Sequence, residues 1–362
     1  MMLTQDSSTD VAIADDDITL VFQGAWHPSL ESNIVQSRAI LPGAKVIVST
    51  LDSDPVLRPL GVDVDCVVSA DPGALPAYKR GKHAPINNVN RQIATSRAGL
   101  ARVTTPYAIK IRTDCTLSSR ACVEKYGLIA SHPQGQARLL VSSIYTLHPD
   151  GIEAFPFHLS DWFFFGPAEL LQAYYAAPFM SDEDATWFEA GREHARGSSY
   201  FARRYVARYT PEQYLAVEFA KRSGCYSTPS FVNDSNAQID AAYRRFLADQ
   251  CIVGDPDELG LRFDKYAHAA RSNYQFFNCL WGSDWRELCE QSGYTLPAFR
   301  TAVSSPSSPA PRGLSTVRHG QRAARRRAVV QTMRRLDFIF PLLRTTGLMP
   351  LVGDLLGFYR KL

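Results

Sequence analysis

The chain has 362 residues, of which 45% are hydrophobic and 21% are charged, and its net charge is +3. This is the composition of a soluble globular protein that is long enough to bury a full core. No stretch approaches the roughly 18 uninterrupted apolar residues of a transmembrane helix. The seven scattered cysteines contain no CxxC pair, which excludes a disulfide scaffold and a zinc site and fits a reducing cytoplasm.

The first part of the chain alternates between short apolar runs and a helical pattern. Residues 1–17 are acidic and lack a signal-peptide pattern, so we expect a disordered leader. Buried strands are predicted at 18–22, 45–49 and 65–69, where β-branched residues dominate. A helix is predicted at 30–41 and ends at Pro42-Gly43. Strand, helix and strand at this spacing favour right-handed crossovers and a parallel sheet.

The middle of the chain continues the α/β pattern. Residues 71–85 are rich in Pro, Gly and Lys and predict a loop, and residues 87–100 predict a helix. The apolar run at 107–111 predicts a central strand that leads directly into Arg112-Thr113-Asp114. The remaining elements are predicted as a helix at 120–130, strands at 137–145 and 157–166, and helices at 167–175, 182–190, 211–222 and 239–250. We therefore expect an α/β sheet of at least five strands with helices on both faces, within a domain at 18–290 whose C-terminal part is mostly helical.

The C-terminal region differs sharply in charge from the rest. Residues 1–290 carry 27 Lys and Arg against 34 Asp and Glu, whereas residues 291–362 carry 12 against 2. Residues 301–316 predict a Ser/Pro linker, and residues 317–362 predict a basic amphipathic tail. We expect the tail to dock on an anionic membrane, because each arginine near such a surface contributes about 1 kcal/mol. Two alternatives are a helix that packs on the domain and, less favoured, a basic arm that binds nucleic acid.

Polar side chains collect where the predicted strands end. Ligands of α/β sheets bind at this edge, and Asp114 ends the central strand. A carboxylate so placed suits Mg²⁺ or Mn²⁺ that holds a substrate diphosphate, although a strand-end Asp can also cap the next helix. No GxGxxG or GxxxxGK[ST] pattern is present, which disfavours dinucleotide and P-loop sites. The candidate nucleotide-binding residues are Gln23, Thr50, Asp52, Asn90, Arg91 and Arg112.

Six segments together carry a family resemblance: ITLVFQG, KVIVSTLDSD, NNVNRQIATSRAGL, PYAIKIRTDCTL, HLSDWFFFG and PEQYL. In this order they resemble the WavE lipopolysaccharide-synthesis family of GT-A-like glycosyltransferases, over about residues 18–285. The resemblance implies a nucleotide-sugar-binding sheet in which Arg112-Thr113-Asp114 stands where GT-A enzymes place a metal-binding Asp-x-Asp. Asp114 would bind the metal, and Arg112 is itself suited to pair with a diphosphate. Asn90 and Arg91 would face sugar and phosphate, and Gln23 and Asp52 the nucleoside.

Glycosyl transfer also requires a group that takes the proton of the acceptor hydroxyl. Asp161 and Glu212 are the two candidates. The aromatic residues after Asp161 either stack on a sugar or fill the core, and Glu212 is also a first-turn carboxylate that the helix dipole favours.

The sequence therefore predicts a cytoplasmic glycosyltransferase at the inner face of the cell membrane. Its donor would be a nucleotide-sugar, and its acceptor a lipopolysaccharide or another glycan or glycolipid. The alternatives are a sugar-phosphate or nucleotidyl transferase on a similar sheet, and a non-catalytic scaffold that docks on membranes.

Overall fold

The computed structural model describes residues 13–297, with gaps at 55–59, 63, 82–83, 133–134, 154, 197, 201, 225 and 264–272, and also residues 326, 328–329 and 331–332. The predicted linker at 301–316 and most of the predicted tail at 317–362 lie outside the described residues. The predicted leader needs a correction at its end. Ile13 is buried in the core and Asp15–Asp17 form a short 3-10 helix, η1, so the last five residues of the segment 1–17 belong to the fold.

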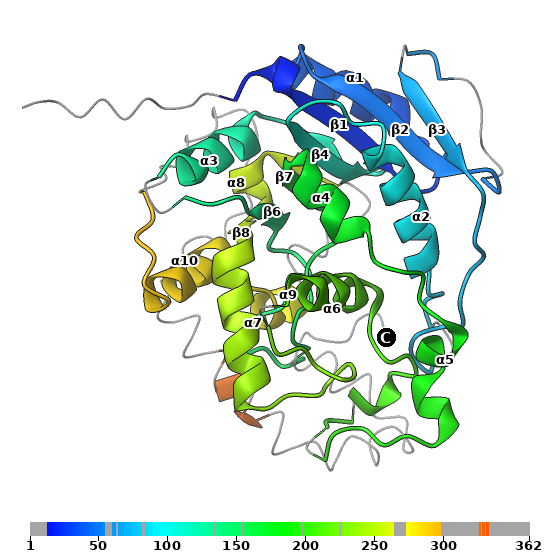
Figure 1. The fold of residues 1–362 in the computed structure, drawn as a ribbon, viewed down its shortest axis with the longest axis vertical. Coiled ribbons are helices and arrows are strands. Elements are labelled where there is room, and N and C mark those ends of the chain that lie inside the picture. The colour runs from blue at the N-terminus through cyan, green and yellow to red at the C-terminus, as the bar shows by residue number, and fades with distance from the viewer. Residues whose placement is uncertain are drawn as a thin grey trace, which may run out of the picture.

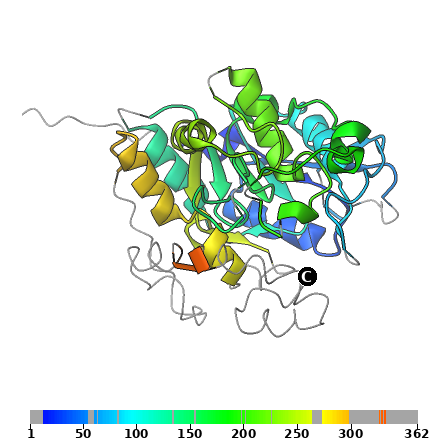
Figure 2. The ribbon, with the colours of Figure 1, turned by 90° about the horizontal axis from the view of Figure 1, so that it is seen from below.

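A seven-stranded sheet with the order β3-β2-β1-β4-β7-β6-β8 forms the centre of the molecule. Its strands are β1 (Ile18–Gln23), β2 (Lys45–Leu51), β3 (Asp65–Ser69), β4 (Tyr107–Arg112), β6 (Leu139–Ser142), β7 (Phe163–Pro167) and β8 (Cys251–Gly254). Two shorter strands, β5 (Thr116–Leu117) and β9 (Leu261–Arg262), pair separately. In Figures 1 and 2 the edge strand β3 lies at one side of the molecule. Helix α10 (Gly282–Gln291) lies at the opposite side and contacts the other edge strand, β8.

The sheet is not uniformly parallel, which corrects the prediction. The four strands β3, β2, β1 and β4 are parallel, but β7 is antiparallel to both β4 and β6. No helix is assigned among the described residues between β6 and β7. Two neighbouring parallel strands need a crossover connection, usually a helix. Because no such helix joins β6 to β7 in the described part of this segment, β7 runs antiparallel to β6. Strand β8 was not predicted, because a four-residue apolar run directly after a helical pattern reads as the continuation of the helix.

The helices follow the predicted pattern closely. They are α1 (Leu30–Ile40), α2 (Val89–Leu100), α3 (Ala121–Ala130), α4 (Ala168–Tyr175), α5 (Asp182–Ala185), α6 (Pro211–Ser223), α7 (Ala237–Gln250), α8 (Pro256–Leu259), α9 (Asn273–Asn278) and α10, with 3-10 helices η2 (Trp187–Ala190) and η3 (Ala202–Arg204). The predicted helix at 182–190 is divided into α5 and η2. The break lies at Thr186, whose backbone, with φ −116° and ψ 25°, leaves helical geometry.

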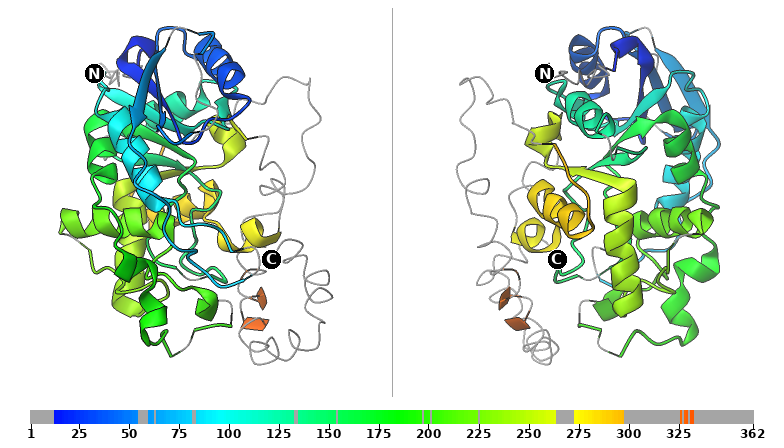
Figure 3. Two further views of the ribbon diagram at one scale, coloured as in Figure 1. Left: turned by 90° about the vertical axis from the view of Figure 1, so that its right-hand side faces the viewer. Right: turned by 60° about the vertical axis from the view of Figure 1, so that its left-hand side comes forward.

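Neighbouring aromatic residues of β7 show that helices cover both faces of the sheet. The ring of Phe164 packs on Tyr174 and Tyr175 of α4, with centroid separations of 4.8 and 5.7 Å. The next ring, Phe165, packs on Tyr126 of α3 at 4.9 Å. Successive side chains of a strand point to opposite faces, so α4 and α3 lie on opposite sides, and Figure 3 shows the layers edge-on. The prediction of an α/β sheet flanked by helices is confirmed.

One arginine from the predicted tail is buried in the domain. The Nη2 atom of Arg326 lies 2.7 Å from Oδ2 of Asp284, and the two side chains are only 3% and 2% exposed. Asp284 lies in the first turn of α10, where its carboxylate also accepts the Trp281 backbone amide. At this position the tail therefore packs on the domain, as the alternative prediction proposed.

Helix α2 lies unusually close to the sheet because Gly99 faces β1 and β2. A Cβ atom at Gly99 would lie 2.7 Å from Cγ1 of Val21 and 2.8 Å from Cβ of Ser49. The Ser49 hydroxyl also donates to the Thr95 carbonyl at 2.7 Å. The glycine thus fixes how near the helix comes to the ends of β1 and β2.

We expect Gly99→Ala to lower stability by about 1–3 kcal/mol, because overpacking outweighs the better helix propensity of alanine. The melting temperature measures this. Gly61→Ala is the matched control, since the nearest atom to its Cβ would be Glu31 Oε1 at 3.8 Å. Equal melting temperatures for the two variants would contradict the close packing of α2.

Candidate active site

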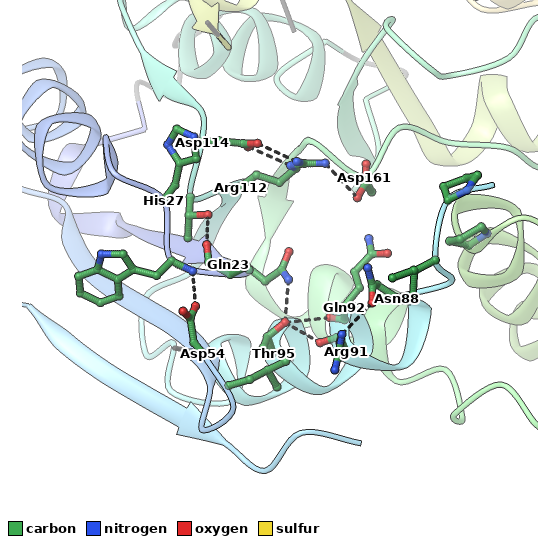
Figure 4. A pocket seen from close by; sticks show the side chains of 18 of the residues that line it. Gln23, His27, Asp54, Asn88, Arg91, Gln92, Thr95, Arg112, Asp114 and Asp161 are labelled. Carbon is green, nitrogen blue, oxygen red and sulfur yellow. Dashed lines mark hydrogen bonds and ion pairs between the residues drawn. The ribbon is translucent and has the colours of Figure 1, made fainter. Parts of the chain in front are cut away.

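A cleft of about 740 Å³ opens at the carboxyl ends of β1, β2 and β4 (Figure 4). This is the edge at which α/β sheets bind ligands, and the volume falls within the usual range of small-molecule sites. Its walls come from the segment after β1, the turn after β2, the start of α2, the end of β4 and the first turn of α6. The lining residues are Gln23, Gly24, Ala25, Trp26, His27, Leu51, Ser53, Asp54, Tyr78, Pro85, Ile86, Asn88, Arg91, Gln92, Thr95, Arg112, Thr113, Asp114, Asp161, Pro211 and Glu212.

The floor of the cleft is held by hydrogen bonds between the sheet and α2. Gln23 is buried and donates from Nε2 to the Thr95 hydroxyl at 2.7 Å. The chain then turns at Gly24, whose φ of +126° disfavours other residues. The Thr113 hydroxyl donates to the Ala25 carbonyl at 2.6 Å, which ties the turn after β1 to the end of β4.

Arg112 and two carboxylates form the charged centre of the cleft. The guanidinium binds Asp114 in a bidentate way, with Nε to Oδ1 at 3.0 Å and Nη2 to Oδ2 at 2.7 Å. Its Nη1 lies 4.0 Å from Oδ2 of Asp161. Figure 4 shows the guanidinium between the two acids. Its face also lies over the Trp162 ring, 5.7 Å from the centroid. Asp114 is buried, whereas 24% of the Arg112 side chain is exposed, so the cation faces the cleft.

The arrangement around Asp114 does not fit the Mn²⁺ or Mg²⁺ expected from the sequence. Both carboxylate oxygens already accept hydrogen bonds from Arg112, and Cys115 Sγ lies 3.5 Å from Oδ1. A divalent ion bound to Asp114 would lie next to the positive charge of this guanidinium. Within the described residues, no three His, Cys, Asp or Glu side chains are grouped so that they could hold a metal. The helix-cap alternative does not apply either, since α3 begins at Ala121 without a side-chain cap.

Arg91 lines the cleft and fastens α2 to the loop that follows β3. Its Nε and Nη2 atoms donate to the two oxygens of Asp71 at 2.8 and 2.7 Å, and Nη1 donates to Asn88 at 3.2 Å. The hydrogen bonds from Arg91 hold the pKa of Asp71 well below its usual range. The guanidinium is about one-third exposed and can contact a ligand beside this ion pair.

Three of the predicted nucleotide-binding residues do not line the cleft. Thr50 is buried, and its hydroxyl lies 3.3 Å from Oδ2 of Asp54. Asp52 is exposed and accepts the Asp71 amide at 3.0 Å. The side-chain amide of Asn90 is bonded to both the N–H and the C=O of Met180, at 2.7 and 3.0 Å. These residues support the walls of the cleft instead.

The turn after β2 contributes Asp54 to the cleft, a residue that sequence reasoning did not select. Its carboxylate accepts the backbone amide of Trp26, and so joins the turns after β1 and β2 (Figure 4). The segment KVIVSTLDSD contains both Asp52 and Asp54, and the pattern alone does not say which of them faces inward. Trp26, His27 and Tyr78 were also missed, because isolated loop residues carry no periodic signal.

Glu212 and Asp161, the two candidates for the base, both line the cleft. Glu212 lies in the first turn of α6, which Thr210 caps by accepting the Gln213 amide at 3.1 Å. Gln213 Nε2 then donates to the carbonyls of Pro156 and Val232, at 2.8 and 3.0 Å, and fixes this turn. Removal of the Glu212 carboxyl from water, together with the charge of Asp161, raises the pKa of Glu212 to about 7.

The aromatic residues that follow Asp161 fill the core. Trp162 and the three phenylalanines at 163–165 are all buried. Lys110 lies behind them, fully buried, and donates to the backbone carbonyl of Asp161. Burial lowers the pKa of Lys110 to about 8. The sugar-stacking interpretation of this strand is therefore not supported, and the core interpretation is.

A family model for WavE lipopolysaccharide synthesis matches residues 18–304. The chain belongs to the WavE family. The match covers the whole sheet and the cleft, which confirms the family resemblance seen in the sequence. Two segments of that resemblance, NNVNRQIATSRAGL on α2 and PYAIKIRTDCTL at the end of β4, supply residues that line the cleft of this WavE protein.

Comparisons outside the family are distant. No curated protein matches the chain. Among solved structures, HddC from Yersinia pseudotuberculosis is 10% identical, with coverage of 43% of this chain and 78% of that one and a TM-score of 0.24. The same protein complexed with GMP-PN is 10% identical, with coverage of 46% and 80% and a TM-score of 0.25. TM-scores this low do not establish a shared fold. None of the described helices combines the length and apolar character needed to span a bilayer.

Proposed function

We propose that this WavE protein is a glycosyltransferase that moves a sugar from a nucleotide-sugar donor to a lipopolysaccharide or another surface-glycan acceptor. The observation that carries the proposal is the grouping of one partly exposed guanidinium, Arg112, with two carboxylates, Asp161 and Glu212, in one cleft. A cation can stabilise a departing diphosphate, and a carboxylate can take the acceptor proton. Membership of a lipopolysaccharide-synthesis family supports the same reaction class.

The donor would lie along the carboxyl edge of the sheet. Its nucleoside would occupy the end near Trp26 and Asp54, and its diphosphate would approach Arg112 and Arg91, because arginine pairs with phosphate through two parallel hydrogen bonds. Asp114 would then hold the Arg112 guanidinium in place through its two hydrogen bonds. Arg112 thus takes the part that the sequence assigned to a divalent cation, and no step requires a metal.

The acceptor would enter beside Glu212, opposite the diphosphate. A carboxyl with a pKa of about 7 is well suited to take a proton from a hydroxyl group near neutral pH. The predicted tail at 317–362 would bring the cleft to the inner face of the cell membrane, where a glycolipid acceptor lies. Apart from residues 326, 328–329 and 331–332, that tail lies outside the described residues.

Release of free nucleoside diphosphate tests the proposal. A set of nucleotide-sugars is first screened by thermal shift, because a ligand that binds only the native state raises the melting temperature. The donor that stabilises the protein is then incubated with a lipopolysaccharide extract. We expect nucleoside diphosphate to form only when both substrates are present. Formation of a nucleoside monophosphate would instead identify a sugar-phosphate transferase. Release of pyrophosphate from a nucleoside triphosphate in the presence of a sugar phosphate would identify a nucleotidyl transferase, and no turnover in any of these assays would favour the scaffold.

A further inference from the structure

A buried histidine lies directly behind Glu212. The His158 side chain is 8% exposed, and its Nδ1 atom lies 2.8 Å from the Tyr145 carbonyl oxygen. A carbonyl oxygen can only accept, so Nδ1 carries the hydrogen. The neutral ring then has its lone pair on Nε2, and Nε2 lies 3.7 Å from Oε2 of Glu212. The imidazole therefore presents an acceptor to the carboxyl group.

The backbone around this imidazole adopts uncommon conformations. Tyr145 and Phe157 are the two non-glycine residues of the described chain with positive φ, at 66° and 59°. Tyr145 supplies the carbonyl that fixes the ring, and Phe157 directly precedes His158. The His158 carbonyl also accepts the Leu147 amide at 3.0 Å. Such conformations cost about 1–3 kcal/mol each and persist only where surrounding contacts hold them. The contacts that hold His158 in one orientation therefore lower the stability of the fold slightly.

Burial keeps the histidine neutral. Burial lowers the pKa of His158 to about 4, so the ring carries no charge at neutral pH. The charged groups that act on Glu212 are Asp161 just before β7, Arg112 from β4 and Lys79 from the loop before α2. The Tyr78 hydroxyl, from the same loop, also feels the Glu212 charge. An uncharged imidazole beside a carboxyl that titrates near neutrality is a pair that can share one proton.

We propose that His158 is a positioning residue that accepts a hydrogen bond from protonated Glu212, so that the two side chains act together when Glu212 takes the acceptor proton. The proposal rests on the function proposed above. The acceptor hydroxyl gives its proton to the Glu212 carboxylate, its oxygen bonds to the anomeric carbon, and the bond from that carbon to the phosphate oxygen breaks. The diphosphate leaves with the electron pair, next to Arg112. The new carboxylic acid donates to Nε2 and later releases its proton to water, while the ring stays neutral throughout.

The separation of 3.7 Å is longer than a hydrogen bond. The proposal requires the Glu212 side chain to approach the ring when substrate binds, as catalytic hydrogen bonds often tighten at that stage. The His158 ring is held by the Tyr145 carbonyl, whereas Glu212 lines the cleft and is 26% exposed, so Glu212 is the partner that we expect to rotate.

The first test needs neither substrate nor mutation. Long-range ¹⁵N NMR of the full-length protein should show His158 as a neutral ring with its hydrogen on Nδ1 between about pH 6 and 8. A ring protonated on Nε2, or a charged imidazolium in this range, would overturn the proposal.

The second test measures Glu212 in the His158→Asn variant. The asparagine amide can still donate to the Tyr145 carbonyl but offers no acceptor at the Nε2 position. Loss of that acceptor disfavours the protonated carboxyl, so the pKa of Glu212, followed by ¹³C NMR of labelled glutamate, should fall by about one unit, a tenfold loss of proton affinity. His158→Gln restores an acceptor near Nε2 and should recover part of the shift. His148→Asn is the control, because the His148 ring lies beside Asp150 outside the cleft. This variant should leave the pKa of Glu212 unchanged.

An unchanged Glu212 titration in His158→Asn would overturn the proton-sharing pair while the proposed transfer reaction stood. If the titration shifts but no donor is ever turned over, the glycosyltransferase proposal fails and the pair itself is supported. Where transfer is measured, the acid limb of the pH profile should move to lower pH in His158→Asn. A purely structural histidine would lower the rate at every pH without moving that limb.

Discussion

Arg112→Ala is expected to lower turnover by about 10²–10³-fold, the usual effect of removing one preorganised group that stabilises charge in the transition state. Donor affinity should also fall more than tenfold, because charge-assisted bonds to phosphate contribute about 1.5–3 kcal/mol. Steady-state kinetics and calorimetry with the cognate donor measure the two effects. Arg112→Lys should recover only part of the activity, since an ammonium keeps the charge but loses the bidentate geometry toward Asp114.

The control for Arg112 is Arg244→Ala, which removes an exposed arginine paired with Asp150 and should change neither quantity. Each variant needs a melting curve, because Arg112→Ala leaves the buried Asp114 without this ion pair. Wild-type turnover should survive treatment with a chelator. Activity that appears only with Mn²⁺ or Mg²⁺, together with a mild effect of Arg112→Ala, would return Asp114 to the role of metal ligand.

Glu212→Gln should lower kcat by about 10²–10⁴-fold, the range for loss of a general base, and should abolish the acid limb of the pH profile. Asp161→Asn is the comparison that assigns the base, since both acids face the cleft. Glu218→Gln is the matched control on the same helix, where Glu218 pairs with Lys221 at 2.8 Å. A larger loss in Asp161→Asn, with near wild-type turnover in Glu212→Gln, would transfer the role of the base to Asp161.

Glu212→Gln should be more stable than the wild type at alkaline pH. The folded state raises the pKa of Glu212 from an ordinary value of 4.5 to about 7. Folding therefore favours the protonated carboxyl, and the stability present below pH 4.5 is lost as the pH rises through about 7. Glutamine cannot ionise and avoids this loss. Melting curves of the two proteins should be closest near pH 4 and separate above pH 7, and curves that stay parallel over this range would show that the site does not strain the ionised carboxylate.

Local sequence patterns were enough to predict the parallel half of the sheet. The runs at 18–22, 45–49, 65–69 and 107–111 are β-branched and apolar, and they became β1, β2, β3 and β4 with small shifts of their ends. The position of β7 between β4 and β6 depends on pairing between distant segments, which no local window contains. Strand β8 was missed for another reason, because a run of four residues is too short to show a hydrophobic period.

The charged centre of the cleft was predictable because it lies where a strand ends. Arg112 is the last residue of β4 and Asp114 follows shortly after it. Asp161 lies just before β7 and Glu212 lies in the first turn of α6, so position along the chain was a usable guide. Asn90 was misplaced because its partner, Met180, is 90 residues away. No sequence pattern marks His158, since its contact with Glu212 forms only when α6 packs beside the segment before β7.

The buried pair of Arg326 and Asp284 bears on where the folded unit ends. The family match stops at residue 304, yet a residue 22 positions later supplies the counter-charge to an acid inside α10. Removing one partner of a buried ion pair typically costs about 3–5 kcal/mol, because the remaining charge has no water to replace it. A protein shortened before residue 326 would therefore lose stability around α10. Weaker membrane association of such a protein would then say little about the lipid affinity of the tail. Arginine substitutions that leave Arg326 in place separate these two properties.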